Sequence, residues 1–540
     1  MTFDPATAAL RLGTGAAACT LLTLLGCATR LWNLHHPQTP VYDETHVGRF
    51  LNWYHDRAFF FDVHGPLSKL LMYWTATMLG FEGRASCPYE DTQPFAADCS
   101  LAAQRLLPAL CGACMIPLTF ATCCAMRLHP LAAMLCSWLV LVDTLWLGLS
   151  RLHLNDMVQM VFIASTHLLA IYSCETPRVA AAGERSLLAT TGLLAATGMC
   201  LGCALQCKYA MALTTLAWLG LQNLAFLAHH WVRWRDLSSL VGQAALRGLL
   251  LLGLPLLLHL SLFALHLAYL PNTGNGDGYM SEAFQSTLIG NKHHGPTAAA
   301  ATAATATTAA HSSLPPSFLS LVWEHSQAQF FYNRNMAIMF PRGSHPFDSA
   351  WHSWPLARRG VYFNLVRDWH SLAATVSKPQ TLGFFLHPNP YIALTTSALV
   401  ALSLLYLAAL VICLPWMLCT RGSAAVGRLA RDCWPGEVGS LAVAYLLHWL
   451  PYATQERQTF LFYYLPAYYF AILLSGRAWH ATACAWLRPH VAAAATIAVG
   501  AVFGHTSWLL APLAFASPTH VDEWTAALRL ASTEVRSGLR

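Results

Sequence analysis

Long hydrophobic runs alternate with shorter polar segments along most of the chain. Eleven of these runs come close to, or exceed, the length of about 20 residues that a helix needs to cross a hydrocarbon core of about 30 Å. The runs cover residues 10–31, 101–124, 130–149, 154–174, 187–206, 209–228, 246–270, 390–418, 438–455, 458–476 and 490–515. The pattern predicts an all-α polytopic membrane protein with about eleven transmembrane helices.

Two runs need a separate interpretation. The run "LSKLLMYWTATMLGF", residues 67–81, is short and carries Lys, Trp and Tyr, which favour the membrane–water boundary. We therefore expect a helix that lies in the interface. The first run, 10–31, ends in "GCATR" and has an alternative interpretation as a signal peptide. We favour an uncleaved span, because the run is longer than a signal core and further spans follow.

The composition agrees with a membrane protein. Of the 540 residues, 56% are hydrophobic and the mean hydropathy is +0.44, whereas soluble domains are about 45–50% apolar. A soluble fold would need a very large core of helices that are apolar on all sides. The formal net charge is +6, but no basic stretch is dense enough for nucleic-acid binding.

The arginines between the runs predict the topology. Cytoplasmic loops of membrane proteins collect Lys and Arg, and with a cytoplasmic N-terminus every second loop does so. The inside loops then hold Arg127, Arg178, Arg185, Arg233, Arg235, Arg247, Arg421, Arg428, Arg431, Arg477 and Arg488.

Charged residues from five separate places then fall on the opposite face. They are Asp43, Glu44, Arg151, Asp156, Lys208, Glu456 and Arg457. A charge at the centre of a bilayer costs about 2.5–3.5 kcal/mol, so charges that converge at the ends of spans predict a shared polar cavity. The alternative is that some of them, Arg151 in particular, are ordinary interfacial anchors.

Two polar excursions, 32–100 and 271–389, lie on this face. In the second, a Gly- and Asn-rich start predicts turns, the Ala/Thr tract 297–313 predicts disorder, and an aromatic part, 340–356, suits a folded loop on the membrane face. We therefore expect an N-terminal transmembrane module, the long loop, a C-terminal four-helix module and a tail. Their bounds are 1–270, 271–389, 390–516 and 517–540.

Two of the 17 cysteines flank a polar segment of the first loop. Cys87 and Cys99 stand on either side of "PYEDTQPFAAD", whereas most of the others lie inside apolar runs. If this loop faces an oxidising compartment, the two thiols are candidates for a disulfide. The sequence leaves the bonded and the free state equally open.

Seven stretches, taken in order between about residues 30 and 475, resemble the eukaryotic protein O-mannosyltransferases of the GT-C class. They are "RLWNLHHPQTPVYDETHVGRF", "FFFDVHGPLSKLL", "RLLPALCGA", "SRLHLNDMV", "GDGYMSEAFQSTLIGN", "HPFDSAWHSWPL" and "RQTFLFYYLPAYYFAILL". The resemblance implies a GT-C fold with interfacial helices in the first lumenal loop. It also implies a multi-pass protein of the endoplasmic-reticulum membrane with a lumenal active site.

The resemblance implies an activity as well. It is transfer of mannose, with inversion, from dolichyl-phosphate-mannose to Ser or Thr hydroxyls of acceptor proteins, without metal or cofactor. Members of the family commonly pair, so a homodimer or a heterodimer with a related transferase is expected. The threonines of the tract 297–313 are themselves candidate acceptors.

The chain departs from the family at two places. Gly65-Pro66 replaces a double proline, which predicts a looser turn because Gly lacks the fixed φ of proline. The lumenal MIR domain of the family does not fit between Asn291 and His345, where the Ala/Thr tract stands. The second departure bears on acceptor selection more than on the chemistry.

Inverting transfer to a hydroxyl needs one carboxylate as general base. The resemblance gives this role to Asp43. Its neighbour Glu44 is expected to point the other way on an extended loop and to hold a loop partner or a cation such as Arg105. The phosphate leaving group needs positive charge, for which Arg105, which matches an arginine of the family, Lys208 and Arg457 are candidates.

Other residues have weaker assignments. His64 and Lys69 frame the acceptor or the phosphate, or else shape the start of the next helix. Asp156 is interpreted as structural, with Arg151 or a nearby loop as its partner. Asp277 and His345 match the family but have no role that their chemistry predicts. Two alternative functions stay open: transfer from a lipid-linked sugar to another acceptor, and a non-catalytic partner subunit.

Overall fold

The computed structural model describes most of the chain. The described residues are 5–38, 40–41, 43–89, 99–174, 187–294, 316–345, 347–366, 380–433, 438–515 and 519–520. The Ala/Thr tract 297–313, with its candidate acceptor threonines, lies outside them.

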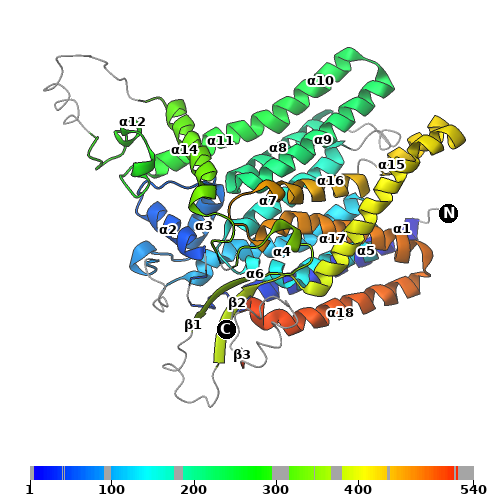
Figure 1. Ribbon diagram of the computed structural model, residues 1–540, viewed down its shortest axis with the longest axis horizontal. Helices are drawn as coiled ribbons and strands as arrows, with labels where there is room; N and C mark the ends of the chain where they lie inside the picture. Colours follow the sequence, from blue (N-terminus) through cyan, green and yellow to red (C-terminus); the bar gives the residue numbers. More distant parts are fainter. Residues whose placement is uncertain are drawn as a thin grey trace.

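All eleven predicted runs contain helices, and these lie side by side in one bundle (Figure 1). The helices are α1 (Pro5–Leu31), α4 (Leu101–Ala125), α5 (Pro130–Val142), α6 (Thr144–Ser150), α7 (Asn155–Cys174), α8 (Leu187–Cys207), α9 (Tyr209–Trp234), α10 (Leu237–Gly248), α11 (Leu254–Tyr269), α15 (Pro390–Cys433), α16 (Val438–Trp449), α17 (Leu465–Trp479) and α18 (Pro489–Phe515). Within the described residues, seven helices are long and apolar enough to cross a membrane, and the bent pair α5–α6 makes an eighth. The predicted all-α membrane fold is therefore confirmed.

One acidic residue explains the bend of 58° between α5 and α6. Asp143 is fully buried, and its Oδ1 accepts hydrogen bonds from the amides of Leu145 and Trp146 at 3.0 and 3.3 Å, which caps α6. Its Oδ2 accepts from the amide of Asn389 and from the Tyr468 hydroxyl, both at 2.9 Å. Asp143 thus ties the bend to the starts of α15 and α17.

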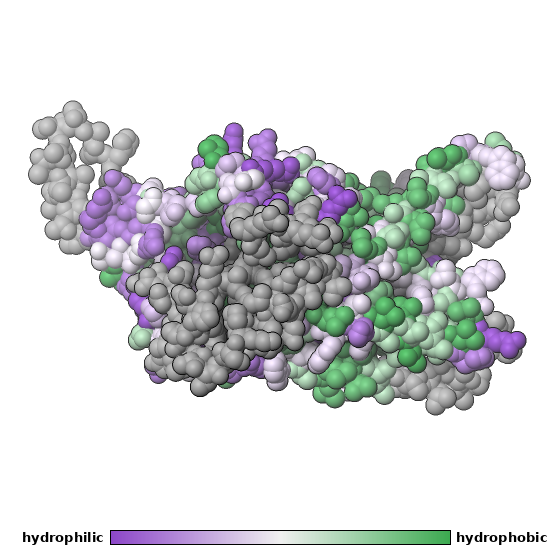
Figure 2. Space-filling view, turned by 60° about the horizontal axis from the view of Figure 1, so that its bottom comes forward, coloured by the Kyte–Doolittle hydropathy of each residue, from purple (hydrophilic) through white to green (hydrophobic). Residues whose placement is uncertain are grey.

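The polar segments gather at one end of the bundle, at the left of Figure 1. They form α2 (Glu44–His55), α3 (Leu67–Met78), η1 (Gly83–Ala85), η4 (Asp277–Tyr279), α12 (Glu282–Gln285), α14 (Phe318–Met339), η5 (Trp351–Ser353), η7 (Leu450–Thr454) and η8 (Leu461–Tyr464). Figure 2 shows hydrophilic side chains at this end and hydrophobic ones along the bundle to the right. The two π-helical turns, η3 (Leu249–Gly253) and η9 (His480–Cys484), lie within or beside the spans.

Two features of this end were not predicted. Helix α14 follows the Ala/Thr tract, and a small antiparallel sheet of order β1-β2-β3 joins β1 (Val361–Val366), β2 (Gln380–Leu386) and β3 (Thr519–His520).

The short run 67–81 forms a helix as predicted, α3, which ends before Gly80 at φ +89°. Leu70 and Met72 of α3 are fully buried, so this helix packs into the bundle end.

Candidate functional site

The Asp43-Glu44 pair lies at the start of α2, where Asp43 is the N-cap and Glu44 the first helical residue. The extended loop expected for the pair is therefore wrong, because Asp43 has the helical angles φ −65° and ψ −9°. The two side chains nevertheless have different surroundings. Glu44 is fully buried, whereas Asp43 retains some exposed surface around a carboxyl that protein atoms largely enclose.

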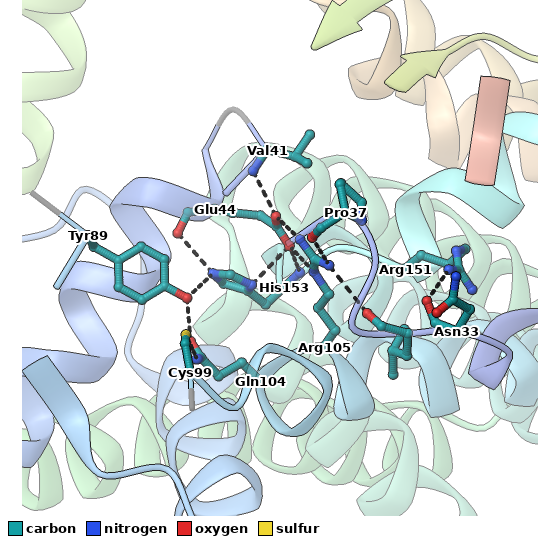
Figure 3. A network of polar contacts seen from close by, with 11 residues as sticks. Asn33, Pro37, Val41, Glu44, Tyr89, Cys99, Gln104, Arg105, Arg151 and His153 are labelled. Carbon is teal, nitrogen blue, oxygen red and sulfur yellow. Dashed lines mark hydrogen bonds and ion pairs between the residues drawn. The ribbon is translucent and has the colours of Figure 1, made fainter. Parts of the chain in front are cut away.

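Glu44 is the centre of a buried polar network (Figure 3). Arg105 of α4 donates two hydrogen bonds to its carboxylate, from Nε to Oε1 at 2.9 Å and from Nη2 to Oε2 at 2.8 Å. The amides of His153 and Val41 donate to the same carboxylate at 2.9 and 2.8 Å. The expected contact between Glu44 and Arg105 is present, and it is bidentate.

Arg105 does not fit the phosphate role that the sequence suggested. Its side chain has no exposed surface, and its remaining Nη1 donates to the carbonyl oxygens of Pro37 and Leu34 at 2.9 and 3.3 Å. The guanidinium therefore faces protein acceptors on every side. Burial alone would raise the pKa of the Glu44 carboxyl, but Arg105 and His153 hold that pKa well below its usual value.

The environment of Asp43 shifts the pKa of its carboxyl in the other direction. Burial of its carboxyl raises the pKa of Asp43 to about 7, although the positive charge of Lys208 works against this rise. The negative charges of Asp156 and Asp62 add to it. The pKa values of the two adjacent carboxyls are thus shifted in opposite directions. Of the two, only Asp43 has a pKa that suits a general base near neutral pH.

A cavity of about 1230 Å³ opens between α9, α11, α14 and the segment 451–463, and Asp43, Glu44 and Arg105 are not among the residues that line it. Its walls include apolar side chains of α9 and α11, such as Met211, Leu213, Leu256 and Leu260. Its polar lining includes His64, Lys208, Asn333, Arg334 and Arg457. The cavity therefore combines an apolar wall formed by spans with three cationic side chains.

Lys208 and Arg457 both lie near the ring of Tyr463 in this lining. The Lys208 ammonium is 5.0 Å from the centre of the Tyr463 ring, and the Arg457 guanidinium is 5.9 Å from it. Lys208 Nζ also donates to Asp156 Oδ1 at 3.1 Å. Burial alone would lower the pKa of Lys208, but Asp156 and Tyr463 keep that pKa above its usual value, so the ammonium stays charged.

Arg151 is not the partner of Asp156, nor an exposed anchor. It is 2% exposed and donates to the carbonyl oxygens of Trp32 and Asn33, at 2.6 and 3.0 Å, just after α1 ends. These oxygens belong to residues whose carbonyls have no helical partner. Arg151 therefore fixes the segment that leads from α1 toward Asp43.

The segment "FDVHGP" closes one side of the cavity. Lys69 forms an ion pair with Asp62 and donates to the Gly65 carbonyl at 2.8 Å, and it is 1% exposed. Lys69 therefore shapes this turn, and it does not line the large cavity. His64 does line the cavity, and burial lowers the pKa of His64 to about 3, which leaves the ring neutral.

The turn at Gly65 is tight, which corrects the prediction of a looser one. A Cβ atom on Gly65 would lie 2.5 Å from the carbonyl oxygen of Gln206 and 2.7 Å from its Cα. Both are backbone atoms at the end of α8, so a side chain there would force two main chains apart. Glycine thus allows the turn to pack directly against α8.

Asp277 and His345 have local roles. Asp277 accepts hydrogen bonds from Thr273 Oγ1, from the Gly274 amide at 3.0 Å and from Asn291 Nδ2 at 2.7 Å, which closes the loop 273–291. The Nδ1 of His345 accepts from the amide of Phe347 at 3.1 Å. Neither residue lines the large cavity.

Cys87 and Cys99 form a disulfide with a Cα–Cα distance of 5.1 Å. Among the residues that the structure describes, no group of three or more His, Cys, Asp or Glu is placed to hold a metal ion.

Only part of the predicted set of charges shares the cavity: Lys208 and Arg457 line it, and Lys208 pairs with Asp156, whereas Glu44 and Arg151 are buried in contacts of their own. Sequence reasoning missed four residues of this site: Asp62, His153, Gln329 and Arg334, the last two of which line the cavity. Asp62 and His153 stand within the stretches "FFFDVHGPLSKLL" and "SRLHLNDMV", so the motifs contained a signal for them. Gln329 and Arg334 lie on the unpredicted α14, and no motif pointed to them.

Two family profiles and several curated proteins match this chain. The family profile described as dolichyl-phosphate-mannose-protein mannosyltransferase matches residues 20–270, and that of the C-terminal four-transmembrane region of protein O-mannosyltransferase matches 318–533. Protein mannosyltransferase 1 of Candida albicans is 32% identical over 284 residues, which are 50% of this chain and 30% of that protein. Protein O-mannosyl-transferase 2 of Danio rerio is 33% identical over 278 residues, which are 51% and 35%.

The fold has a close match among solved structures. The S. cerevisiae protein O-mannosyltransferase Pmt1-Pmt2 complex bound to the sugar donor aligns with a TM-score of 0.78 and 18% identity, over 95% of this chain and 92% of that one. The predicted GT-C fold is thereby confirmed. The curated relatives are aligned over only about a third of their length. With two family profiles that together span most of its length, the chain belongs to the dolichyl-phosphate-mannose–protein mannosyltransferase family.

Proposed function

We propose that the protein transfers mannose from dolichyl-phosphate-mannose to Ser or Thr hydroxyls of proteins, with inversion at the anomeric carbon. One observation carries the proposal: a carboxyl with a pKa of about 7, Asp43, is close enough to feel the charge of Lys208, which lines a cavity with apolar walls. The apolar wall suits a polyprenyl chain, and the cations suit its phosphate.

We assign a residue to each step of the transfer. Asp43 takes the proton from the acceptor hydroxyl as the oxygen attacks the anomeric carbon from the face opposite the phosphate. Lys208 and Arg457 bind the phosphate and stabilise the negative charge that grows on its leaving oxygen, and Arg334 reaches the same cavity. The leaving phosphate is a stable anion, so no general acid is required. Glu44 and Arg105 hold the start of α2.

The cellular setting is part of the proposal. The solved relative is a Pmt1-Pmt2 complex, and we propose that this chain also pairs with a related transferase or with a second copy. We place it in the endoplasmic-reticulum membrane with α2 and the cavity on the lumenal side. The Cys87–Cys99 disulfide supports an oxidising compartment for this end.

The direct test incubates the purified chain with labelled dolichyl-phosphate-mannose and a panel of Ser/Thr peptides, followed by site mapping. We expect mannose on Ser or Thr hydroxyls in the α configuration at each mapped site if the donor is β-linked. Label on a lipid or a glycan would favour the other acceptor class. Absence of transfer with intact donor binding would favour the non-catalytic partner.

The pH profile of kcat/KM tests the assigned base. Because Asp43 must be ionised to accept a proton, and its pKa is raised to about 7, kcat/KM should fall as the pH drops through about 7 and level off above it. The measurement is initial rates between pH 5 and 9 at constant ionic strength, each rate read below donor saturation. A profile that stays flat down to pH 5 would contradict the raised pKa.

Removal of the Lys208 ammonium should weaken donor binding. Because Lys208→Met alone would leave Asp156 buried without its partner, the variant to test is Lys208→Met with Asp156→Asn. A hydrogen bond to a charged group contributes about 1.5–3 kcal/mol, so we expect a donor Kd at least about tenfold higher. Arg235→Met, at the other end of α9, is the matched control. An unchanged Kd would remove Lys208 from the phosphate site.

A further inference from the structure

Tyr89 lies between the Cys87–Cys99 disulfide and the Glu44 network (Figure 3). Its hydroxyl donates to Gln104 Oε1 at 2.6 Å and lies 3.4 Å from His153 Nε2. Gln104 Nε2 in turn donates to Cys87 Sγ at 3.4 Å. The ring and the hydroxyl are fully buried. A short chain of contacts therefore runs from the disulfide to Glu44.

The backbone of Tyr89 is held in an unfavourable conformation. Its φ is +50°, in the left-handed region that a non-glycine residue adopts only where its surroundings enforce it. Two side chains of α2 hold this segment: Arg49 Nε donates to the Tyr89 carbonyl and Asn52 Nδ2 to the Cys87 carbonyl, both at 2.9 Å. The disulfide holds it from the other side, since Cys99 stands two residues before α4.

The ring of Tyr89 also sets how closely α2 approaches. A Cβ atom on Gly48 would lie 2.2 Å from Cζ of this ring, so α2 packs against it with no space to spare. On the far side, His153 Nε2 lies 2.9 Å from the Glu44 carbonyl oxygen, and the His153 amide donates to Oε1. A shift of Tyr89 would therefore displace the helix that begins with Asp43 and Glu44.

We propose that Tyr89 is a positioning residue through which the Cys87–Cys99 disulfide holds the acidic pair in place, so that opening the disulfide slows transfer. The inference rests on the proposed function for its kinetic part only. A dithiol reductant supplies the two electrons and two protons: the S–S bond becomes two thiols while the reductant closes to its own disulfide. Released Cys87 no longer enforces the left-handed backbone of Tyr89.

The experiment compares oxidised and reduced full-length protein in lipid nanodiscs. Thiol alkylation at Cys87 and Cys99 reports the opening, hydrogen exchange of the α2 amides reports the displacement, and kcat and donor KM report the reaction. We expect faster exchange in α2 and a kcat about tenfold to a hundredfold lower, the range for a small misplacement of a catalytic group. Donor KM should change little, because Lys208 and Arg457 lie on other segments.

Variants separate positioning from general stability. Tyr89→Phe keeps the ring but loses the hydroxyl, and should lower kcat in the oxidised protein by less than reduction does, with little change in donor KM. Gly48→Ala should mimic reduction. The double variant Cys87→Ser with Cys99→Ser should be slow and insensitive to reductant. Tyr391→Phe, on an exposed tyrosine of α15, is the control.

Alkylation at both cysteines with unchanged exchange in α2 would overturn the inference, whatever the transfer rate. So would an unchanged kcat in reduced protein whose oxidised form is active. Faster exchange in a protein that transfers no mannose even when oxidised would support the positioning link and refute the proposed function.

Discussion

Replacing Asp43 with Asn is expected to abolish mannose transfer while leaving donor binding intact. The amide is nearly isosteric with the carboxylate, but it cannot accept the proton of the attacking hydroxyl. General base catalysis contributes about 10²- to 10⁴-fold to a rate, so kcat should fall by at least about a hundredfold. Donor Kd should change by less, because Lys208, Arg334 and Arg457 still line the cavity.

The matched control is Asp56→Asn. Asp56 is the C-cap of the same helix, α2, and its carboxylate pairs with Arg84 at 3.8 Å on the exposed side. It should retain wild-type kcat. Full activity of Asp43→Asn would remove Asp43 as the base. Loss of both transfer and donor binding would indicate instead that Asp43 holds the start of α2.

The bundle could be predicted because its signal is local. A run of about 20 apolar residues must form a helix in a bilayer, since its backbone groups have no other partner there. Each apolar run of this chain therefore contains a helix, as predicted. The bend between α5 and α6 was not predicted, because it depends on the cap that Asp143 provides. Helix α14 was not predicted, because it is less apolar than the spans and lies in the long polar loop.

The partners within the site could not be predicted in the same way. Charge placement showed that Asp156 and Lys208 share one face, but not that they pair with each other. The sequence motif made Arg105 a candidate to bind the phosphate. In the structure its guanidinium is instead surrounded by Glu44 and two carbonyl oxygens. Pairing depends on contacts between segments more than 50 residues apart, which no local pattern records.

Breaking the Glu44–Arg105 pair is expected to have the largest effect on stability. Removal of one member of a buried ion pair costs about 3–5 kcal/mol, because the other charge stays buried without compensation. In Glu44→Gln, Arg105 would keep its contacts to Pro37 and Leu34 but lose the carboxylate that neutralises it. The amides of Val41 and His153 would also lose a charged acceptor.

A double-mutant cycle isolates the pair from other effects of each substitution. Glu44→Gln with Arg105→Met removes both charges, so the double variant should unfold at a higher temperature than Glu44→Gln alone, by thermal unfolding in a fixed detergent. Arg84→Gln, which breaks the exposed pair of α2 with Asp56, should change stability by less than about 1 kcal/mol. Equal unfolding temperatures for Glu44→Gln and the wild type would show that the pair does not hold α2. The position of Asp43 would then rest on the contacts of Arg151 after α1 and on the packing of Tyr89 against α2.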